Sequence, residues 1–278
     1  MTIDQIIERA LIEDIQDGDH TSLATIPITA QGKAQLLVKE SGVIAGIEVA
    51  KKVFHQVDDS IKFIQFFKDG DQIKIGDIAF EVSGKSISLL TAERLALNFM
   101  QRMSGIATAT NKIVKLIEGT NTRILDTRKT TPNLRLLEKE AVKLGGGENH
   151  RMGLYDMIMI KDNHVDFAGG IANAIDATQD YLAKNHKELK IEIEVRNFDE
   201  LDQVLKHGNV DRIMLDNFTP SELNRAVDII GKKYETEASG GITIETIREY
   251  AETGVDYISV GALTHHIKSL DLSLKAIS

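Results

Sequence analysis

Six short apolar segments recur through the second half of the chain, and their spacing is the feature that most limits the fold. The segments are RILD (ending at Asp126), DMIMI, IEIEV, DRIML, ETEAS and DYISV (ending at Val260). The last three follow at intervals of about 20 to 24 residues, the length of a strand, loop and helix in a parallel β/α repeat. Six strands are too few for a closed eight-stranded barrel, so the spacing predicts an incomplete, open barrel. A further strand is expected near 107–118 or 265–275.

The first hundred residues have a different pattern. Short apolar runs alternate with turn residues such as Asp-Gly and Gly-Asp, which predicts hairpin strands. Helices are expected over residues 2–14 and 48–58, on either side of the first two of these runs. This part of the chain is therefore predicted to be a mixed α and β unit.

A long helix is predicted over residues 91–119, with Thr91 as its N-cap. Arg102 lies on one face of this helix, away from its apolar stripe. We place the domain boundary in this helix, so that residues 1–106 form an N-terminal domain and residues 107–278 a second domain. Part of the C-terminal tail is expected to pack on the first domain.

Composition excludes several classes of function. The chain has no cysteine, which excludes disulfides, a thiolate nucleophile and cysteine-ligated metal sites. Its net charge of −9 argues against a broad nucleic-acid surface. No apolar run approaches the roughly 18 residues that a membrane span needs, and the acidic N-terminus does not resemble a signal peptide. We therefore expect a cytoplasmic protein with neither nucleic acid nor membrane as a partner.

A polar or glycine-rich segment follows each predicted strand. Because the carboxyl ends of parallel strands face one common mouth, we expect these segments to converge. Cations come first in the series, carboxylates follow, and glycines with a hydroxyl come last. These residues are Arg128, Lys129, His150, Arg151 and Lys161, then Glu194 and Asp216, then Ser239, Gly240, Gly241 and Gly261.

This order of side chains suits a ligand with three kinds of group. Guanidinium groups bind carboxylates with two parallel hydrogen bonds. Two separated carboxylates suit a hydrated Mg²⁺ carried in on a polyphosphate, and glycine-rich turns bind phosphate through backbone N–H groups. Glu192 and Glu194 alternate on one side of their strand, so either could supply the first carboxylate. We favour Glu194, which lies closer to the mouth.

The sequence resembles the quinolinate phosphoribosyltransferase family. The blocks ILDTRKTTPNLR, KLGGGENHRMGLYDMIMIKDNH, IEIEV, IMLDN, EASGGI and ISVGALTH occur in this order, and EDIQDGDHTS and ERLALNFMQRMSGIAT match as well. The resemblance implies an N-terminal α/β sandwich followed by an incomplete, open-faced α/β barrel. It also implies a reaction of quinolinate with phosphoribosyl pyrophosphate (PRPP) and Mg²⁺ that yields nicotinate mononucleotide, pyrophosphate and CO₂.

The same resemblance assigns roles to individual residues. It implies that substrate is bound by Arg102, Thr127, Arg128, Lys129, His150, Arg151, Lys161, Glu194, Asp216, Ser239, Gly240, Gly241 and Gly261. Four of them, Arg128, His150, Arg151 and Lys161, are implied to hold the carboxylates of quinolinate. Arg102 is implied to join them from the neighbouring subunit of a homodimer, or of a hexamer built from dimers.

The catalytic roles implied by the resemblance fall to Lys129, Lys161, Glu194 and Asp216. Both lysines are implied to meet the phosphates of PRPP, while the two carboxylates lie beside the ribose and its Mg²⁺. The hydroxyl and glycines of the late strands are implied to cradle the 5′-phosphate.

Other interpretations remain open. A second class of phosphoribosyltransferase carries two acids before a Thr-Gly phosphate loop, but the adjacent pair Asp58–Asp59 has no such loop. A paralogue of the same fold could act on another substrate. A non-catalytic sensor of pyridine carboxylates or nucleotides would bind its ligand without releasing pyrophosphate.

Overall fold

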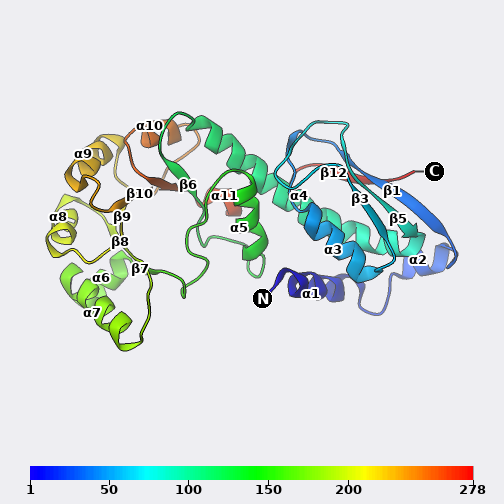
Figure 1. Cartoon of the computed structure of the whole chain (residues 1–278), viewed down its shortest axis with the longest axis horizontal. Helices are drawn as coiled ribbons and strands as arrows, with labels where there is room; N and C mark the ends of the chain where they lie inside the picture. The colour runs from blue at the N-terminus through cyan, green and yellow to red at the C-terminus, as the bar shows by residue number, and fades with distance from the viewer. Residues whose placement is uncertain (278) are drawn as a thin grey trace. The chain divides into compact units, whose positions relative to one another are not determined.

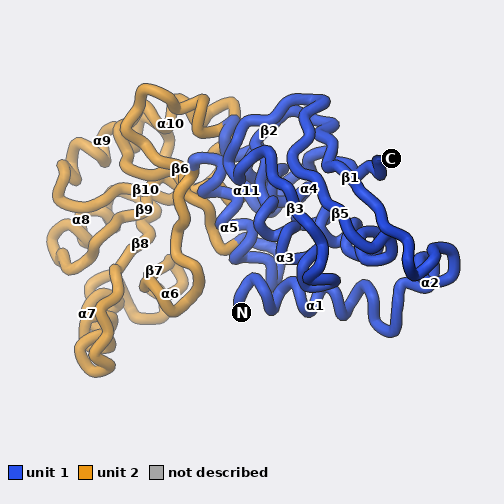
Figure 2. The backbone as a smooth tube through the Cα atoms, turned by 45° about the vertical axis from the view of Figure 1, so that its right-hand side comes forward, with its two compact units in different colours: residues 1–112, 129–146, 262–278 blue, residues 113–128, 147–261 orange. Residues whose placement is uncertain are grey.

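The computed structural model describes residues 1–277 (Figure 1). The chain forms two compact units that interleave along the sequence (Figure 2). Unit 1 comprises residues 1–112, 129–146 and the segment from Ala262 onward, and unit 2 comprises residues 113–128 and 147–261. The boundary predicted from the sequence divides the chain once, after residue 106. Among the described residues, no helix is long and apolar enough to cross a membrane.

Unit 1 is built on a four-stranded antiparallel sheet with the order β12-β1-β5-β3. Its strands are β1 (Gln31–Val38), β3 (Lys62–Gln65), β5 (Ile78–Lys85) and β12 (Leu272–Ile277), beside a small pair formed by β2 (Gly42–Val43) and β4 (Gln72–Ile73). Its helices are α1 (Ile3–Ile15), α2 (His20–Thr25), α3 (Ile47–Val57), α4 (Ser86–Leu116), α5 (Arg135–Leu144) and α11 (Ala262–His265). The sheet thus joins the first strand of the chain to its last.

Aromatic packing holds helix α3 against this sheet. Phe54 of α3 lies 6.2 Å, between ring centroids, from both Phe63 of β3 and Phe80 of β5. The two strand residues are 4.4 Å apart by the same measure. Phe54 and Phe80 are fully buried, so this cluster forms part of the core of unit 1.

The long helix differs from its prediction at the N-terminal end. Helix α4 begins at Ser86, directly after β5, and Thr91 lies inside it, where its hydroxyl donates to the carbonyl of Ile87 at 2.9 Å. The predicted N-cap was therefore wrong, because a threonine in a helix can bond back to the preceding turn as readily as it caps one. Residues 107–116 are helical, and the strand found at Leu272–Ile277 pairs with β1 in unit 1, so no barrel strand lies there.

Unit 2 contains the six predicted strands in one sheet, all paired in parallel. The strands are β6 (Arg123–Leu125), β7 (Ile158–Ile160), β8 (Ile191–Val195), β9 (Arg212–Asp216), β10 (Glu235–Ser239) and β11 (Tyr257–Ser259), in the order β6-β11-β10-β9-β8-β7. The helices are α6 (Asp162–Ala168), α7 (Ile171–Lys184), α8 (Phe198–His207), α9 (Pro220–Ile230) and α10 (Ile247–Ala251). Helices α7 to α10 flank the outer side of the strands (Figure 1). With β6 and β7 at its edges, the sheet is an open barrel, which confirms the predicted fold.

Gly105 tests how tightly the last segment of unit 1 packs on α4. A β-carbon on Gly105 would overlap the carbonyl oxygen of Lys268 and lie 3.1 Å from a side-chain carbon of Ile267. Helix propensity alone favours alanine over glycine by about 1 kcal/mol. We expect the overlap to prevail, so that Gly105→Ala lowers the free energy of unfolding by roughly 1–3 kcal/mol in a urea titration. Unchanged or increased stability would contradict this close approach.

Candidate active site

The carboxyl ends of the strands of unit 2 share one edge of the sheet. Residue-by-residue pairing of β10 with β9 places Ser239 beside Asp216, and β8 pairs with β9 so that Glu194 lies opposite Met214. Lys161 follows β7 directly, and Gly261 comes two residues after the end of β11. The strand order therefore lines up the segments that carry Arg128, Gly261, Ser239, Asp216, Glu194 and Lys161 along this edge.

A lysine and two carboxylates form one part of the site. The Nζ atom of Lys161 lies 3.1 Å from Oε2 of Glu194. Burial raises the pKa of Asp216, the negative charge of Glu194 raises it further, and the charge of Lys161 opposes both. These two carboxylates are thus close enough to repel each other. A divalent cation bound to a substrate phosphate would relieve that repulsion, so the residues fit a hydrated Mg²⁺.

The turn after β10 shows why glycine is required next to these acids. Gly240 has φ of +93°, and a β-carbon there would overlap the side chain of Asn217. Asn217 itself donates a 2.6 Å hydrogen bond from Nδ2 to Oδ2 of Asp216. Gly241 follows with φ of +64°, and space around its β position is open within 4 Å. A backbone of this kind can approach an anion closely, because no side chain shields the main chain.

The guanidinium groups of Arg128 and Arg151 form the cationic part of the site. Burial lowers the pKa of Arg151, and the positive charge of Arg128 lowers it further. The two arginines are therefore near enough to repel each other within unit 2. Nη1 of Arg151 donates to the carbonyl of Met157 at 3.1 Å, which fixes the direction of its side chain. Two neighbouring guanidinium groups are typical of a site that receives a carboxylate.

His150 is the most buried of the predicted site residues in this unit, with only 7% of its surface exposed. Its Nε2 lies 2.9 Å from Oε2 of Glu192 and 3.4 Å from Oε2 of Glu237. Nη1 of Arg212 lies 3.0 Å from Oε2 of Glu237. From the sequence, Glu192 was expected only as an alternative to Glu194, and neither Glu237 nor Arg212 was expected at the site. The sequence did contain a signal for this cluster, namely three charged residues, Glu192, Arg212 and Glu237, within strands expected to be buried.

Charge balance in this cluster determines where a proton is held. Two buried carboxylates face one guanidinium, so neutrality requires one further proton on His150 or Glu192. Burial would lower the pKa of His150, but the nearby carboxylates of Glu192 and Glu237 raise it to about 9. Burial and the charge of Glu237 raise the pKa of Glu192 to about 7. Nδ1 of His150 lies 2.7 Å from the backbone nitrogen of Arg151, so the other ring nitrogen, Nε2, faces the two carboxylates.

Arg102 and Lys129 belong to unit 1. Nε of Arg102 donates to Oε1 of the buried Glu138 at 2.7 Å, and its Nη2 donates to the carbonyl of Thr264 at 3.1 Å. The hydroxyl of Thr264 donates to the carbonyl of Lys129 at 2.7 Å. Thr264 therefore links these two predicted site residues within unit 1. That Arg102 serves a neighbouring subunit stays a prediction.

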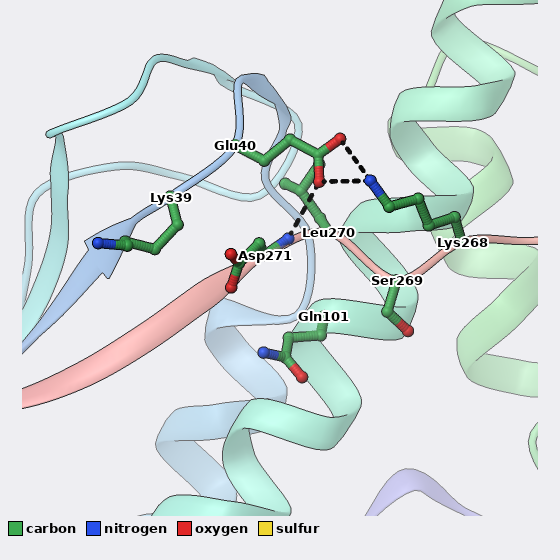
Figure 3. A pocket seen from close by; sticks show the side chains of 7 residues that line it. All are labelled: Lys39, Glu40, Gln101, Lys268, Ser269, Leu270 and Asp271. Carbon is green, nitrogen blue, oxygen red and sulfur yellow. Dashed lines mark hydrogen bonds and ion pairs between the residues drawn. The ribbon is translucent and has the colours of Figure 1, made fainter.

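An open hollow of about 460 Å³ in unit 1 is formed by other residues (Figure 3). Glu40 points toward Lys268, whose Nζ lies 3.4 Å from both carboxylate oxygens, and accepts a hydrogen bond from the backbone N–H of Asp271. The charge of Glu40 is thus balanced within the hollow, and its lining contains none of the predicted site residues.

The cluster around His150 makes stability depend on pH. The folded pKa of about 9 lies above the unfolded value of about 6.5, so the folded chain holds this proton more tightly. The stabilisation is present below pH 6.5 and is lost as the pH rises toward 9. We expect urea unfolding to show a loss on the order of 2 kcal/mol over this range in the unmodified chain and a smaller loss in His150→Gln. Equal losses would contradict the assignment.

Comparison with known proteins agrees with this architecture. The family model "Quinolinate phosphoribosyl transferase, N-terminal domain" matches residues 19–104, and the corresponding C-terminal domain matches residues 106–275. The chain is 47% identical to "Quinolinate phosphoribosyltransferase [decarboxylating] 1" of Nicotiana glauca, over 97% of this chain and 81% of that protein. It is 40% identical to "Probable nicotinate-nucleotide pyrophosphorylase [carboxylating]" of Bacillus subtilis, over 99% and 93%.

Solved structures give the same result. The nicotinate-nucleotide pyrophosphorylase of Francisella tularensis superposes with a TM-score of 0.93 at 41% identity, covering 99% of this chain and 96% of that one. Both domains of the family, in the same order, therefore account for nearly the whole sequence. The chain belongs to the quinolinate phosphoribosyltransferase family.

Proposed function

We propose that this chain transfers the phosphoribosyl group of PRPP to quinolinate with loss of CO₂, forming nicotinate mononucleotide and pyrophosphate for NAD biosynthesis. The observation that carries the proposal is the arrangement within unit 2. The guanidinium groups of Arg128 and Arg151, which affect each other's charge, lie on the same barrel as Lys161, which is paired with Glu194, and Asp216, whose pKa both of these residues shift. This combination suits a dicarboxylate and a phosphorylated sugar in one mouth.

Recognition of quinolinate falls to the cationic part of the site. Arg128 and Arg151 bind its carboxylates, and their mutual repulsion in the free protein is relieved when an anion lies between them. His150 and Lys161 complete the proposed carboxylate site. In the proposed homodimer, or hexamer of dimers, Arg102 reaches the mouth of the neighbouring subunit.

The opposite part of the mouth receives PRPP and its Mg²⁺. Glu194 and Asp216 lie beside the ribose, where Mg²⁺ bound to the substrate neutralises the leaving pyrophosphate. Lys129 and Lys161 contact the phosphates. The 5′-phosphate is held by the backbone of the turns that carry Ser239, Gly240, Gly241 and Gly261, and Thr127 is a further residue that binds substrate in this proposal.

The residues of this site stabilise charge rather than form a covalent intermediate. The ring nitrogen of quinolinate attacks C1 of the ribose as the bond to pyrophosphate breaks, through a state with positive charge on the sugar. The carboxylates stabilise that charge, and such preorganised interactions contribute about 3–4 kcal/mol each. The 2-carboxylate then leaves as CO₂, its bonding electrons pass to the positively charged ring, and the ring carbon takes up a proton. The cytoplasmic location stays a prediction.

The reaction is tested by pyrophosphate release from Mg²⁺ and PRPP with quinolinate, with nicotinate, or with no pyridine. We expect release with quinolinate alone, accompanied by nicotinate mononucleotide. Release with none of the three, while a ligand still binds, would favour the sensor. A different acceptor would favour a paralogue.

Arg128→Ala tests the proposed carboxylate site. We expect quinolinate binding, measured by calorimetry, to weaken beyond detection, because one guanidinium–carboxylate pair is lost, while PRPP binding remains measurable. Arg9→Ala, which removes a guanidinium from the exposed face of α1, is the matched control and is expected to bind both ligands normally. Unchanged affinity of Arg128→Ala for quinolinate would remove this residue from the site.

A further inference from the structure

Three charged side chains lie at the centre of the sheet of unit 2. Glu192 of β8 and Glu237 of β10 are fully buried, and Arg212 of β9 is 8% exposed. Arg212 pairs in register with Glu192 on one side and with Glu235 on the other. Burying such a cluster costs more free energy than packing apolar side chains of similar size. Its presence therefore calls for a role besides stability.

The carboxylate oxygens of Glu192 and Glu237 lie next to the ring of His150. Nε2 of His150 is within 2.9 and 3.4 Å of the two carboxylates, and its backbone N–H donates to Oδ1 of the buried Asp126 at 2.9 Å. The residue is thus held at the ring and at the main chain. The next residue is Arg151, whose backbone N–H points at the other ring nitrogen. Any displacement of the ring would therefore be transmitted to the segment that carries Arg151.

The three groups His150, Glu192 and Glu237 also have the spacing of a metal site, since their ligand atoms all lie within 4.8 Å of one another. Arg212 argues against that use. Its guanidinium lies 3.0 Å from Oε2 of Glu237 and above the ring of Tyr257, 4.0 Å from the centroid. A divalent ion would add positive charge beside a guanidinium and beside a histidine that already brings the cluster to neutrality. A proton balances the cluster without an ion.

We propose that Glu237 and Glu192 are positioning residues for the recognition of the substrate's carboxylates. Through Nε2 they fix the ring of His150, and through His150 they fix the backbone of Arg151, from which its guanidinium reaches the carbonyl of Met157. This inference rests on the proposed function, because it concerns how the same site recognises its dicarboxylate substrate. It gives the buried charges a task that apolar side chains could not perform.

The test measures steady-state kinetics of pyrophosphate release in the full chain for Glu237→Gln, with PRPP and quinolinate varied in turn. Misplacing a binding group by about 1 Å can cost up to roughly 100-fold. We expect KM for quinolinate to rise about tenfold or more, while KM for PRPP changes less than about twofold. Glu235→Gln is the matched control, because Glu235 also pairs with Arg212, at 3.1 Å, but does not contact His150. It is expected to change neither KM by more than about twofold.

A double-mutant cycle separates positioning from a general loss of structure. In the His150→Gln background, Glu237→Gln should raise KM for quinolinate no further, because its effect passes through the ring. Equal rises in both KM values, additive effects, or an unchanged KM for quinolinate in Glu237→Gln would each overturn the inference. If the unmodified chain releases no pyrophosphate with quinolinate, the proposed function fails instead.

A measurement on the unmodified chain covers the case in which the variants do not fold. With ¹⁵N-labelled histidine, one Nε2–H signal should be protected from exchange, since Nε2 of His150 is buried 2.9 Å from a carboxylate oxygen of Glu192. Addition of quinolinate alone should shift that signal, because the ligand contacts the segment that the ring holds. A protected signal that quinolinate leaves unshifted, or the absence of a protected signal, would overturn the proposal.

Discussion

Parallel, in-register pairing of six short strands is the constraint on which the site depends. Strand β10 pairs with β9 from Glu235↔Arg212 to Ser239↔Asp216, so each residue of one strand has a fixed neighbour on the next. Side chains alternate between the two faces of a sheet, and a slip of one residue would transfer them to the opposite face. Arg212, Asp216, Glu237 and Ser239 thus share one face of the sheet, with Asp216 and Ser239 at the carboxyl ends of their strands and Arg212 and Glu237 further from that edge.

The interior charges connect the core of unit 2 to its mouth. Glu192 and Glu237 are fully buried, yet they end at His150, which belongs to the loop that also carries Arg151. A low-dielectric surrounding strengthens each of these interactions and makes an unpaired member costly. The loop is consequently tied to the buried interior of the sheet. A site on a loop can be held in place in this way without losing its opening to substrate.

In unit 1, a buried acid and a threonine hold the two predicted site residues, Arg102 and Lys129, in place. Glu138 is 1% exposed and accepts from both Arg102 and the backbone N–H of Thr131. Thr264 of α11 joins Arg102 to Lys129 through its carbonyl and hydroxyl groups. Residues from three separate segments of the chain are thereby fixed together. Neither Glu138 nor Thr264 stands out in the sequence, because a single acid and a single hydroxyl, each within a helix, carry no pattern.

The sequence by itself determined the elements and their order. Apolar spacing predicted all six barrel strands, because a strand is a local, periodic feature. The polar segments after the strands indicated the edge of the sheet at which Lys161, Glu194 and Asp216 lie, because parallel strands all end on the same side. Only the tertiary structure decided that the chain's last strand joins the first sheet, that α4 begins at Ser86 and that Glu237 faces His150. These features depend on contacts between residues far apart in sequence, and the free energy of such contacts outweighs local preference.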